Sequence, residues 1–161
     1  MIGGSLGAKR INELIEANLS YFEANNLQVI WQTGKLYFEK YKKYQSASVQ
    51  VHEFLDRMDL AYSAADYIIS RAGAGSVSEL CMVAKPVLFI PSPNVAEDHQ
   101  TKNAMSLVKE EAALMLKETD LEEKFQQEFL ALISSEALQQ KLGANILKLA
   151  KPNATKDIAD E

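Results

Sequence analysis

The sequence predicts an α/β fold in which a parallel sheet is flanked by helices. Short apolar segments typical of strands alternate with longer segments of helical periodicity, the pattern of strand–helix–strand units with right-handed crossovers. Two glycine-rich turns, Gly3-Gly4-Ser5-Leu6-Gly7-Ala8 and Ser70-Arg71-Ala72-Gly73-Ala74-Gly75, each end a strand and open a helix. Ligands of open parallel sheets bind at the carboxyl ends of the strands, so both turns are expected on the ligand-binding edge.

The first part of the chain predicts three helices and three strands. Ile11, Leu14, Ile15 and Leu19 recur near helical spacing, so residues 8–24 are expected to form an amphipathic helix. The elements expected next are a strand over residues 27–31, a helix over 35–44, a strand over 48–54, a short helix over 58–65 and a buried strand over 67–70.

The second part predicts two further strands and four helices. Val87-Leu88-Phe89-Ile90 is a continuous apolar run that ends at Pro91-Ser92-Pro93, as expected of a buried strand. Helices are expected over residues 76–84, 98–110, 120–133 and 135–150, and the last strand over residues 113–116.

The chain begins unusually for a strand that leads into a glycine turn. A buried strand has about five residues, and only Ile2 stands before the first turn in the place of such a strand. We therefore expect the first strand to be largely truncated, and residues 1–161 to be one domain of a longer protein.

Composition excludes several classes of protein. The net charge is −5 with a pI near 5.2, and no dense basic stripe with interleaved aromatic residues occurs, which argues against nucleic-acid binding. Cys81 is the single cysteine, which excludes an internal disulfide and a cysteine-rich zinc site; a buried, inert thiol is expected. No His, Cys, Asp and Glu residues have metal-ligand spacing, and no apolar run is long enough to span a membrane.

The two glycine-rich turns are candidate anion sites. A helix N-terminus carries unpaired N–H groups and a partial positive charge, and both turns open a helix. The first turn lacks the G-x-G-x-x-G dinucleotide pattern, and the strand that follows its helix ends at Gln32-Thr33-Gly34 without an acidic residue for a ribose. The P-loop pattern is absent as well. A ligand with a phosphate and a polyol, such as a nucleotide sugar, fits these turns better than a dinucleotide or a nucleoside triphosphate.

Six short motifs, in their order along the chain, carry a resemblance to a known family. They are the opening Gly-Gly-Ser-Leu-Gly-Ala, Gln32-Thr33-Gly34-Lys35, Phe54-Leu55-Asp56, Ser70-Arg71-Ala72-Gly73-Ala74 with Ser78-Glu79, residues 86–91, and Asp98-His99-Gln100 with Asn103-Ala104. Together they resemble the bacterial lipid II synthases, which transfer N-acetylglucosamine (GlcNAc) from UDP-GlcNAc to undecaprenyl-pyrophosphoryl-MurNAc-pentapeptide (lipid I) in peptidoglycan synthesis.

The resemblance implies an inverting glycosyltransferase of the GT-B type, with two Rossmann-like domains that face a cleft. Residues 1–161 correspond to its donor domain, a Rossmann-like parallel sheet flanked by helices. The family's other domain holds lipid I, supplies the general base and associates with the inner face of the cell membrane in the cytoplasm. The resemblance therefore implies no catalytic residue, cofactor or metal in this chain, and an isolated domain that binds UDP-GlcNAc without turnover.

The resemblance also assigns binding residues. It places Ser5, Leu6 and Gly7 at the diphosphate, Ala74, Gly75 and Ser76 at the diphosphate and ribose, and Phe54 and Leu55 at the uracil, mainly through the Leu55 main chain. It places Glu79 at the ribose hydroxyls, His99 at the sugar or ribose, and Gln100 at the GlcNAc hydroxyls. The family often has a Leu-Thr pair where this chain has Gly75-Ser76, which puts a side-chain contact at Gly75 in doubt.

Some of these residues have structural interpretations as well. Ser76-Val77-Ser78-Glu79 reads as a capping box with Glu79 at the third helical position. Arg71 fits either a phosphate contact or a structural ion pair. Asn103 is expected to support the loop before the helix at 98–110, Glu97 and Asp98 are expected to be first-turn acids, and His52 is expected to be structural.

Three other functions stay open on the sequence. One is the donor subunit of a two-polypeptide lipid-linked GlcNAc transferase. Another is a non-catalytic domain that binds a UDP-sugar. The third is the donor domain of a diacylglycerol glycosyltransferase.

Overall fold

The computed structural model describes residues 1–3, 7–94 and 98–151 and contains five strands, all parallel to their neighbours. β1 (Val29–Gln32) pairs with β2 (Val49–His52). β4 (Val87–Phe89) lies between β3 (Ile68–Ser70) and β5 (Leu114–Met115). The predicted α/β fold with a parallel sheet is therefore confirmed.

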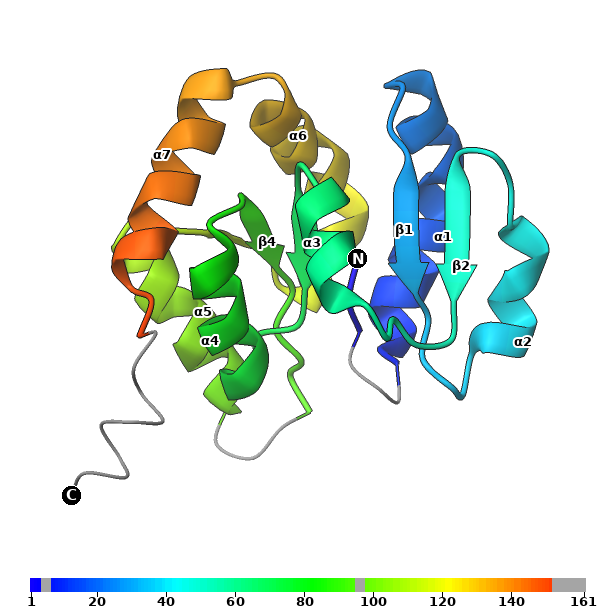
Figure 1. Cartoon of the computed structure of the whole chain (residues 1–161), viewed down its shortest axis with the longest axis horizontal. Helices are drawn as coiled ribbons and strands as arrows, with labels where there is room; N and C mark the ends of the chain where they lie inside the picture. Colours follow the sequence, from blue (N-terminus) through cyan, green and yellow to red (C-terminus); the bar gives the residue numbers. More distant parts are fainter. Residues whose placement is uncertain (4–6, 95–97, 152–161) are drawn as a thin grey trace.

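Ile2 lies between the two groups of strands. It forms parallel bridges to Gln32 at the end of β1 and to Ser70 at the end of β3. The Ile2 N–H donates to the Ile69 carbonyl at 2.9 Å, and the Gln32 N–H donates to the Met1 carbonyl at 3.2 Å. Within the described residues the strand order is thus β2, β1, Ile2, β3, β4, β5, with a single bridging residue at the centre (Figure 1).

A cavity of about 430 Å³ opens beside this bridge. Its walls include Val29 and Ile30 of β1, Ile68 and Ile69 of β3, and side chains from the helix between β2 and β3. The Met1 amino group donates to the Ile30 carbonyl at 2.7 Å, and burial lowers the pKa of this amino group to about 5. The centre of the sheet is therefore incompletely filled beside Ile2.

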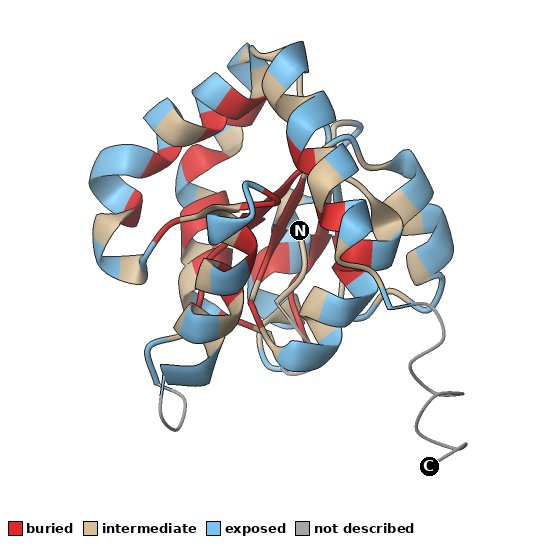
Figure 2. Ribbon diagram, turned by 90° about the vertical axis from the view of Figure 1, so that its left-hand side faces the viewer, coloured by how far each residue is buried: buried red, intermediate tan, exposed pale blue. Residues whose placement is uncertain are grey.

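Alternation along the buried strands divides the core into two clusters, one on each face of the sheet. Ile69, Leu88 and Ile90 belong to one cluster, whereas Ile68 and Phe89 belong to the other. Successive strand side chains point to opposite faces, so a strand that is apolar at every position must be covered on both sides. Figure 2 shows these buried strands at the centre and the exposed sides of the helices outside.

The helices supply the cover. α1 (Lys9–Ala24) and α6 (Leu121–Ile133) pack on the first face, where Ile11, Ile15, Phe22, Phe125 and Phe129 are buried. α4 (Ala74–Val83) and α5 (His99–Lys109) pack on the second face. α7 (Glu136–Lys148) packs against α4 and α6.

The predicted elements are confirmed with ends shifted by a few residues. The helix expected over residues 35–44 is shorter, α2 (Phe38–Tyr41), and continues as the 3₁₀ turn η1 (Lys42–Tyr44). The expected short helix is α3 (Met58–Ala64), and the 3₁₀ turn η3 (Glu118–Asp120) precedes α6. Cys81 is buried with a free thiol, as predicted, and burial raises its pKa. No helix in the described parts of the chain has the length and apolar character needed to cross a bilayer.

Candidate functional site

The candidate site lies along one edge of the sheet, where the strands end. The arrowheads of the strands and the first residues of α1, α4 and α5 lie on the same side of the molecule, in the lower part of Figure 1. Parallel strands joined by right-handed crossovers bring every strand end to this edge. The sequence prediction that the singled-out loops share one edge is therefore confirmed for the described residues.

The first glycine turn approaches the β1 end closely at Gly7. Gly7 has a φ of 84°, and a Cβ at this position would lie 2.1 Å from the Thr33 carbonyl oxygen. Only glycine fits such a position, because an L side chain is strained at positive φ and no space exists for it. α1 begins at Lys9, with Ala8 as its N-cap and no side-chain capping bond. Ser5 and Leu6, the other residues predicted to meet the diphosphate, lie outside the described residues.

A buried polar network joins α1 to the end of β1, beside the Gly7 turn. The Asn12 amide nitrogen donates to the Thr33 carbonyl at 2.9 Å, and the Trp31 indole nitrogen donates to the Asn12 amide oxygen at 2.8 Å. Asn12, Trp31 and Thr33 are each fully buried. Sequence reasoning missed this network. The available signal was a polar residue, Asn12, next to the apolar stripe of α1.

The second glycine turn opens α4 earlier than predicted. Gly73 is the N-cap, in an extended conformation with ψ of 149°, and the Val77 N–H donates to the Gly73 carbonyl at 2.9 Å. The N–H groups of Ala74, Gly75 and Ser76 therefore belong to the first helical turn, which has no acceptors within the helix. A Cβ at Gly75 would meet nothing within 4 Å, so the space beside this turn is open. The turn is suited to an anion.

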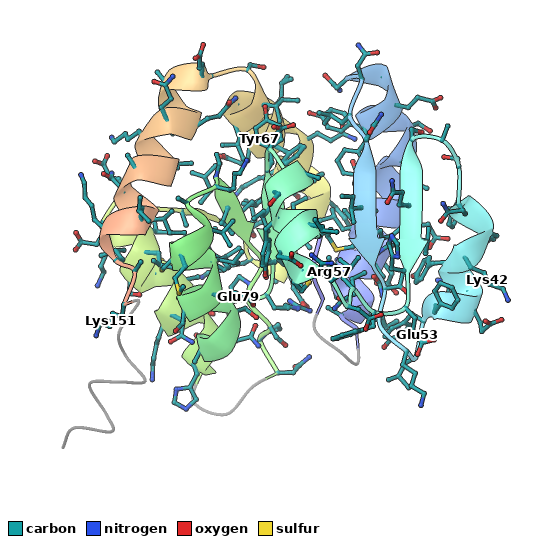
Figure 3. The ribbon with its side chains drawn as sticks, viewed as in Figure 1. Lys42, Glu53, Arg57, Tyr67, Glu79 and Lys151 are labelled. Carbon is teal, nitrogen blue, oxygen red and sulfur yellow. The ribbon has the colours of Figure 1, made fainter. Side chains whose placement is uncertain are left out.

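The capping-box interpretation of Glu79 is wrong. The box requires Ser76 as N-cap, whereas the helix begins two residues before Ser76 and Gly73 caps it without a side-chain bond. Glu79 therefore lies in the second turn of α4, where its side chain is exposed at the candidate edge (Figure 3). Burial, followed by the nearby negative charge of Glu79, raises the pKa of the Tyr62 hydroxyl on α3 (Met58–Ala64). The carboxylate is consequently available to a ligand rather than to the helix end.

Phe54 and Leu55 follow β2 at the same edge. Phe54 is 53% exposed, and its ring offers a flat apolar surface to a ligand. The Leu55 N–H donates to the Gln32 side-chain oxygen at 3.0 Å, and Gln32 is buried at the end of β1. The main chain at Leu55 is therefore anchored from inside the domain, and its N–H is already used.

Gln100 and His99 begin α5. The Gln100 side-chain oxygen accepts a hydrogen bond from the Ser92 N–H at 2.9 Å, which ties the start of α5 to the loop after β4. His99 is exposed. Asp98 is not a first-turn acid as predicted: it is the N-cap, with φ of 54° and no side-chain capping bond. Glu97 lies outside the described residues.

Arg71 and Asn103 stabilise the second turn. The Arg71 guanidinium pairs with Glu118 at 2.5 Å and donates to the Ile90 carbonyl at 2.9 Å, and both charged side chains are largely buried. The structure thus favours the ion-pair interpretation of Arg71. Asn103 donates to the Ala72 carbonyl at 3.0 Å, so it supports the β3–α4 turn. The expected support of the loop before α5 involves residues 95–97, which lie outside the described residues.

Two further expectations concern histidine and metal ions. The His52 carbonyl accepts the Thr33 N–H at 2.9 Å, and the side chain is half-buried at the end of β2, in keeping with a structural position. In the part of the chain that the structure describes, no three His, Cys, Asp or Glu side chains gather in a way that could hold a metal ion.

Comparisons with known proteins agree on one family. A family model described as the glycosyltransferase family 28 C-terminal domain matches residues 1–161. Curated relatives named UDP-N-acetylglucosamine--N-acetylmuramyl-(pentapeptide) pyrophosphoryl-undecaprenol N-acetylglucosamine transferase are similar over the whole chain. The relative from Christiangramia forsetii is 61% identical over 161 residues, and that from Flavobacterium psychrophilum is 56% identical over 162 residues.

The match covers only part of each relative. The chain is covered completely, but it spans 44% of the length of both relatives. Among solved structures, the crystal structure of Acinetobacter baumannii MurG matches with a TM-score of 0.84 and 30% identity, over 99% of this chain and 47% of that one. The likeness therefore extends over the entire described fold.

Proposed function

This chain belongs to the glycosyltransferase family 28 C-terminal domain family, and from that premise we propose that it is the UDP-GlcNAc-binding domain of a lipid II synthase. In this proposal a second domain holds lipid I, and the whole enzyme associates peripherally with the inner face of the cell membrane. The transferred GlcNAc completes lipid II for peptidoglycan synthesis. The names of the relatives supply the donor and the acceptor.

One observation carries the proposal: three kinds of binding group share one edge of the sheet. The open first turn of α4 offers the N–H groups of Ala74, Gly75 and Ser76. Glu79 presents a carboxylate one helical turn further along α4. The exposed Phe54 follows β2, in the other half of the sheet. A diphosphate, a vicinal diol and a flat base require those three kinds of surface.

The proposed reaction is an inverting transfer. The C4 hydroxyl of MurNAc attacks the anomeric carbon of GlcNAc, the bond from that carbon to the diphosphate oxygen breaks, and the hydroxyl proton passes to a base. UDP leaves with the electron pair. The N–H groups at the α4 N-terminus and the helix dipole stabilise the negative charge that develops on the diphosphate. We assign the base to the acceptor domain, so this chain by itself binds donor and does not catalyse transfer.

A thermal-shift titration tests donor binding. The ligands are UDP, UDP-GlcNAc, UDP-glucose and NAD, each offered to the chain as it stands. A ligand of the native state at 100 times its dissociation constant adds about 2.7 kcal/mol, which raises the melting temperature of a domain of this size by roughly 5–10 °C. We expect this rise with UDP and UDP-GlcNAc but not with NAD.

Matched variants assign the effect to the site. Glu79→Ala is expected to abolish the rise without changing the melting temperature of the free protein, because the exposed Glu79 side chain caps no helix. Glu123→Ala, at an exposed position of α6, serves as the control and keeps the rise. A rise with NAD alone, or lipid II synthesis by the isolated chain, would contradict the proposal.

A further inference from the structure

A largely buried ion pair joins three strand ends beside the second glycine turn. Arg71 is the first residue after β3, and its guanidinium pairs with Glu118, which follows β5 at the start of η3. The same guanidinium donates to the carbonyl of Ile90, the first residue after β4, at 2.9 Å. The Arg71 and Glu118 side chains are only 15% and 14% exposed. One side chain thus ties the ends of β3 and β4 to the segment after β5 at the candidate edge.

Packing in the described part of the chain does little to hold the first turn of α4. Gly73 caps the helix without a side-chain bond, and Ala74 and Gly75 are exposed. Among the described residues, a Cβ at Gly73 would meet only the Ser76 hydroxyl oxygen, 4.0 Å away, and a Cβ at Gly75 would meet nothing within 4 Å. The position of the N–H groups in this turn therefore depends on the residues just before it.

The two residues before Gly73 carry the anchors. Arg71 is held by its ion pair and its bond to the β4 end, and the Ala72 carbonyl accepts the Asn103 side-chain amide of α5 at 3.0 Å. Ala72 itself is fully buried. Binding groups that are held in place before the ligand arrives lose less conformational entropy on binding, which raises affinity. The anchors at residues 71 and 72 give the exposed turn this advantage.

The geometry also argues against a direct phosphate contact by Arg71. A guanidinium donates in a fixed planar fork, and this one is directed toward the Glu118 carboxylate and the Ile90 carbonyl. The adjacent carboxylate balances the charge of the guanidinium, so the pair as a whole attracts an anion only weakly. Any effect of Arg71 on an anion at this turn therefore acts through the main chain that follows it.

We propose that the Arg71–Glu118 pair positions the first turn of α4, so that the N–H groups of residues 74–76 converge on the diphosphate of a uridine nucleotide. Arg71 and Glu118 are positioning residues in this arrangement and do not touch the ligand. The inference rests on the proposed function, because it requires that this turn binds the diphosphate. It gives the ion pair a role in ligand affinity beyond its place in the fold.

Calorimetric titration with UDP and with uridine tests this role. Uridine keeps the base and the ribose and lacks the diphosphate. Glu118→Gln removes the charge that holds the guanidinium and keeps the size of the side chain. We expect its affinity for UDP to fall about fivefold, the effect of losing one hydrogen bond of ordinary strength, while its affinity for uridine stays within about twofold of the unmodified chain. Loss of a negative charge near an anion would by itself raise the affinity for UDP, so a fall identifies lost positioning.

Arg71→Lys gives a second test that keeps both charges. A lysine ammonium can still pair with Glu118, so the carboxylate is not left without a cation and the fold is retained. The ammonium is a point charge, however, and does not reproduce the fork that holds Glu118 and the Ile90 carbonyl together. We expect the same loss of affinity for UDP and an unchanged affinity for uridine. A positive charge that acted directly on the diphosphate would instead leave the UDP affinity of this variant unchanged.

Glu111→Gln is the matched control. Glu111 precedes β5, at the opposite end of that strand from Glu118, and pairs with Lys141 of α7 at 2.7 Å. Both glutamate variants lose the same charge and one ion pair, so a general effect of either loss would appear in both. We expect Glu111→Gln to bind UDP and uridine as the unmodified chain does.

The outcomes separate this inference from the proposed function. If either Glu118→Gln or Arg71→Lys binds UDP as tightly as the unmodified chain, the inference is wrong and the proposed function stands. If the variants lose affinity for UDP and uridine by the same factor, the ion pair has only a structural role and the inference is again wrong. If Glu118→Gln does not fold, Arg71→Lys decides alone. If the unmodified chain binds neither UDP nor uridine, both the inference and the proposed function fail.

Discussion

Single polar side chains hold the candidate site together by binding main-chain groups. Gln32 accepts the Leu55 N–H, Gln100 accepts the Ser92 N–H, and Asn103 donates to the Ala72 carbonyl. Each bond is between 2.9 and 3.0 Å long and restrains a loop at the end of a strand. Side-chain amides suit this task because they satisfy a main-chain group without adding charge near an anionic ligand. The loops are thus preorganised from inside the domain.

Gly7 is the residue at which the fold tolerates no side chain. We expect Gly7→Ala to lower the free energy of unfolding by at least about 2 kcal/mol, because alanine is strained at positive φ and its Cβ would meet the Thr33 carbonyl. The melting temperature should fall by roughly 4–8 °C. Thermal unfolding followed by circular dichroism measures this change.

Gly75→Ala provides the comparison within the same chain. A Cβ at Gly75 meets no atom within 4 Å, and this glycine lies inside a helix at negative φ. Alanine is favoured over glycine there by roughly 0.5–1 kcal/mol, so the variant should be slightly more stable than the unmodified chain. Equal effects of the two substitutions would show that close packing at Gly7 does not control stability.

At the scale of elements, two serines with similar sequence contexts have different positions relative to the start of a helix. The serine at 135 is the N-cap of α7, and its hydroxyl accepts the Leu138 N–H at 3.2 Å. Ser76 has an equally favourable sequence context but lies inside α4, because the chain turns into the helix at Gly73. The Asn103 bond to Ala72 holds the chain just before that turn. Tertiary contacts therefore decide where α4 begins, whereas local capping is sufficient for α7.

The two serines should respond differently to removal of the hydroxyl. Ser135→Ala removes a cap and should cost about 1 kcal/mol of stability, or roughly 2–4 °C of melting temperature. Ser76→Ala removes no cap and should leave the melting temperature unchanged, while it weakens UDP binding if Ser76 contacts the ligand. Differential scanning calorimetry with and without UDP measures both effects. A Ser76→Ala variant as destabilised as Ser135→Ala would restore the capping-box interpretation.

On the scale of the whole molecule, the two core clusters meet across a sheet whose centre is held by Ile2. The cavity beside Ile2 is bordered by apolar residues of β1 and β3, and the Met1 amino group lies buried against Ile30. An extended apolar segment would find both walls and unoccupied space there. A charged amino group at the same place opposes folding, because burial disfavours its protonated form.

For a polypeptide of residues 1–161 with a free amino group on Met1, stability should therefore rise with pH between about 5 and 8. The amino group has a pKa of about 5 in the folded chain and 8.0 as its ordinary value. Between those values the unfolded chain binds more protons than the folded chain, so raising the pH favours folding. The gain across this window should be about 3 kcal/mol, measured by urea unfolding at pH 5 and pH 8.

Two extensions added before Met1 separate the effect of the buried charge on stability from the effect of the unfilled cavity. A run of four β-branched residues and a run of four glycine and serine residues both convert the buried amine to an amide, so both should flatten the pH dependence. Only the apolar run fills the cavity, and it should add at least about 2 kcal/mol more stability at pH 8. Equal stability of the two extended chains would show that the cavity does not accept apolar side chains.

The sequence by itself determined the order of the elements, the parallel sheet, the two glycine turns and the family. These features depend on hydrophobic periodicity and on the backbone conformations that each residue prefers. Both can be recognised from residues that are close together in the sequence. The same local reasoning placed the start of α4 and the role of Asp98 wrongly, and it did not foresee that Asn103 bonds to Ala72, 31 residues away in the chain.

Only the tertiary structure decided which polar groups meet. Gln32 and Leu55 are 23 residues apart, and Arg71 pairs with Glu118 on another element. No local pattern specifies such pairs, because each depends on how separate elements pack around a shared core. The sheet brings its strand ends to one edge, and the packing of the separate elements there determines that Gln32 meets Leu55 and that Arg71 meets Glu118.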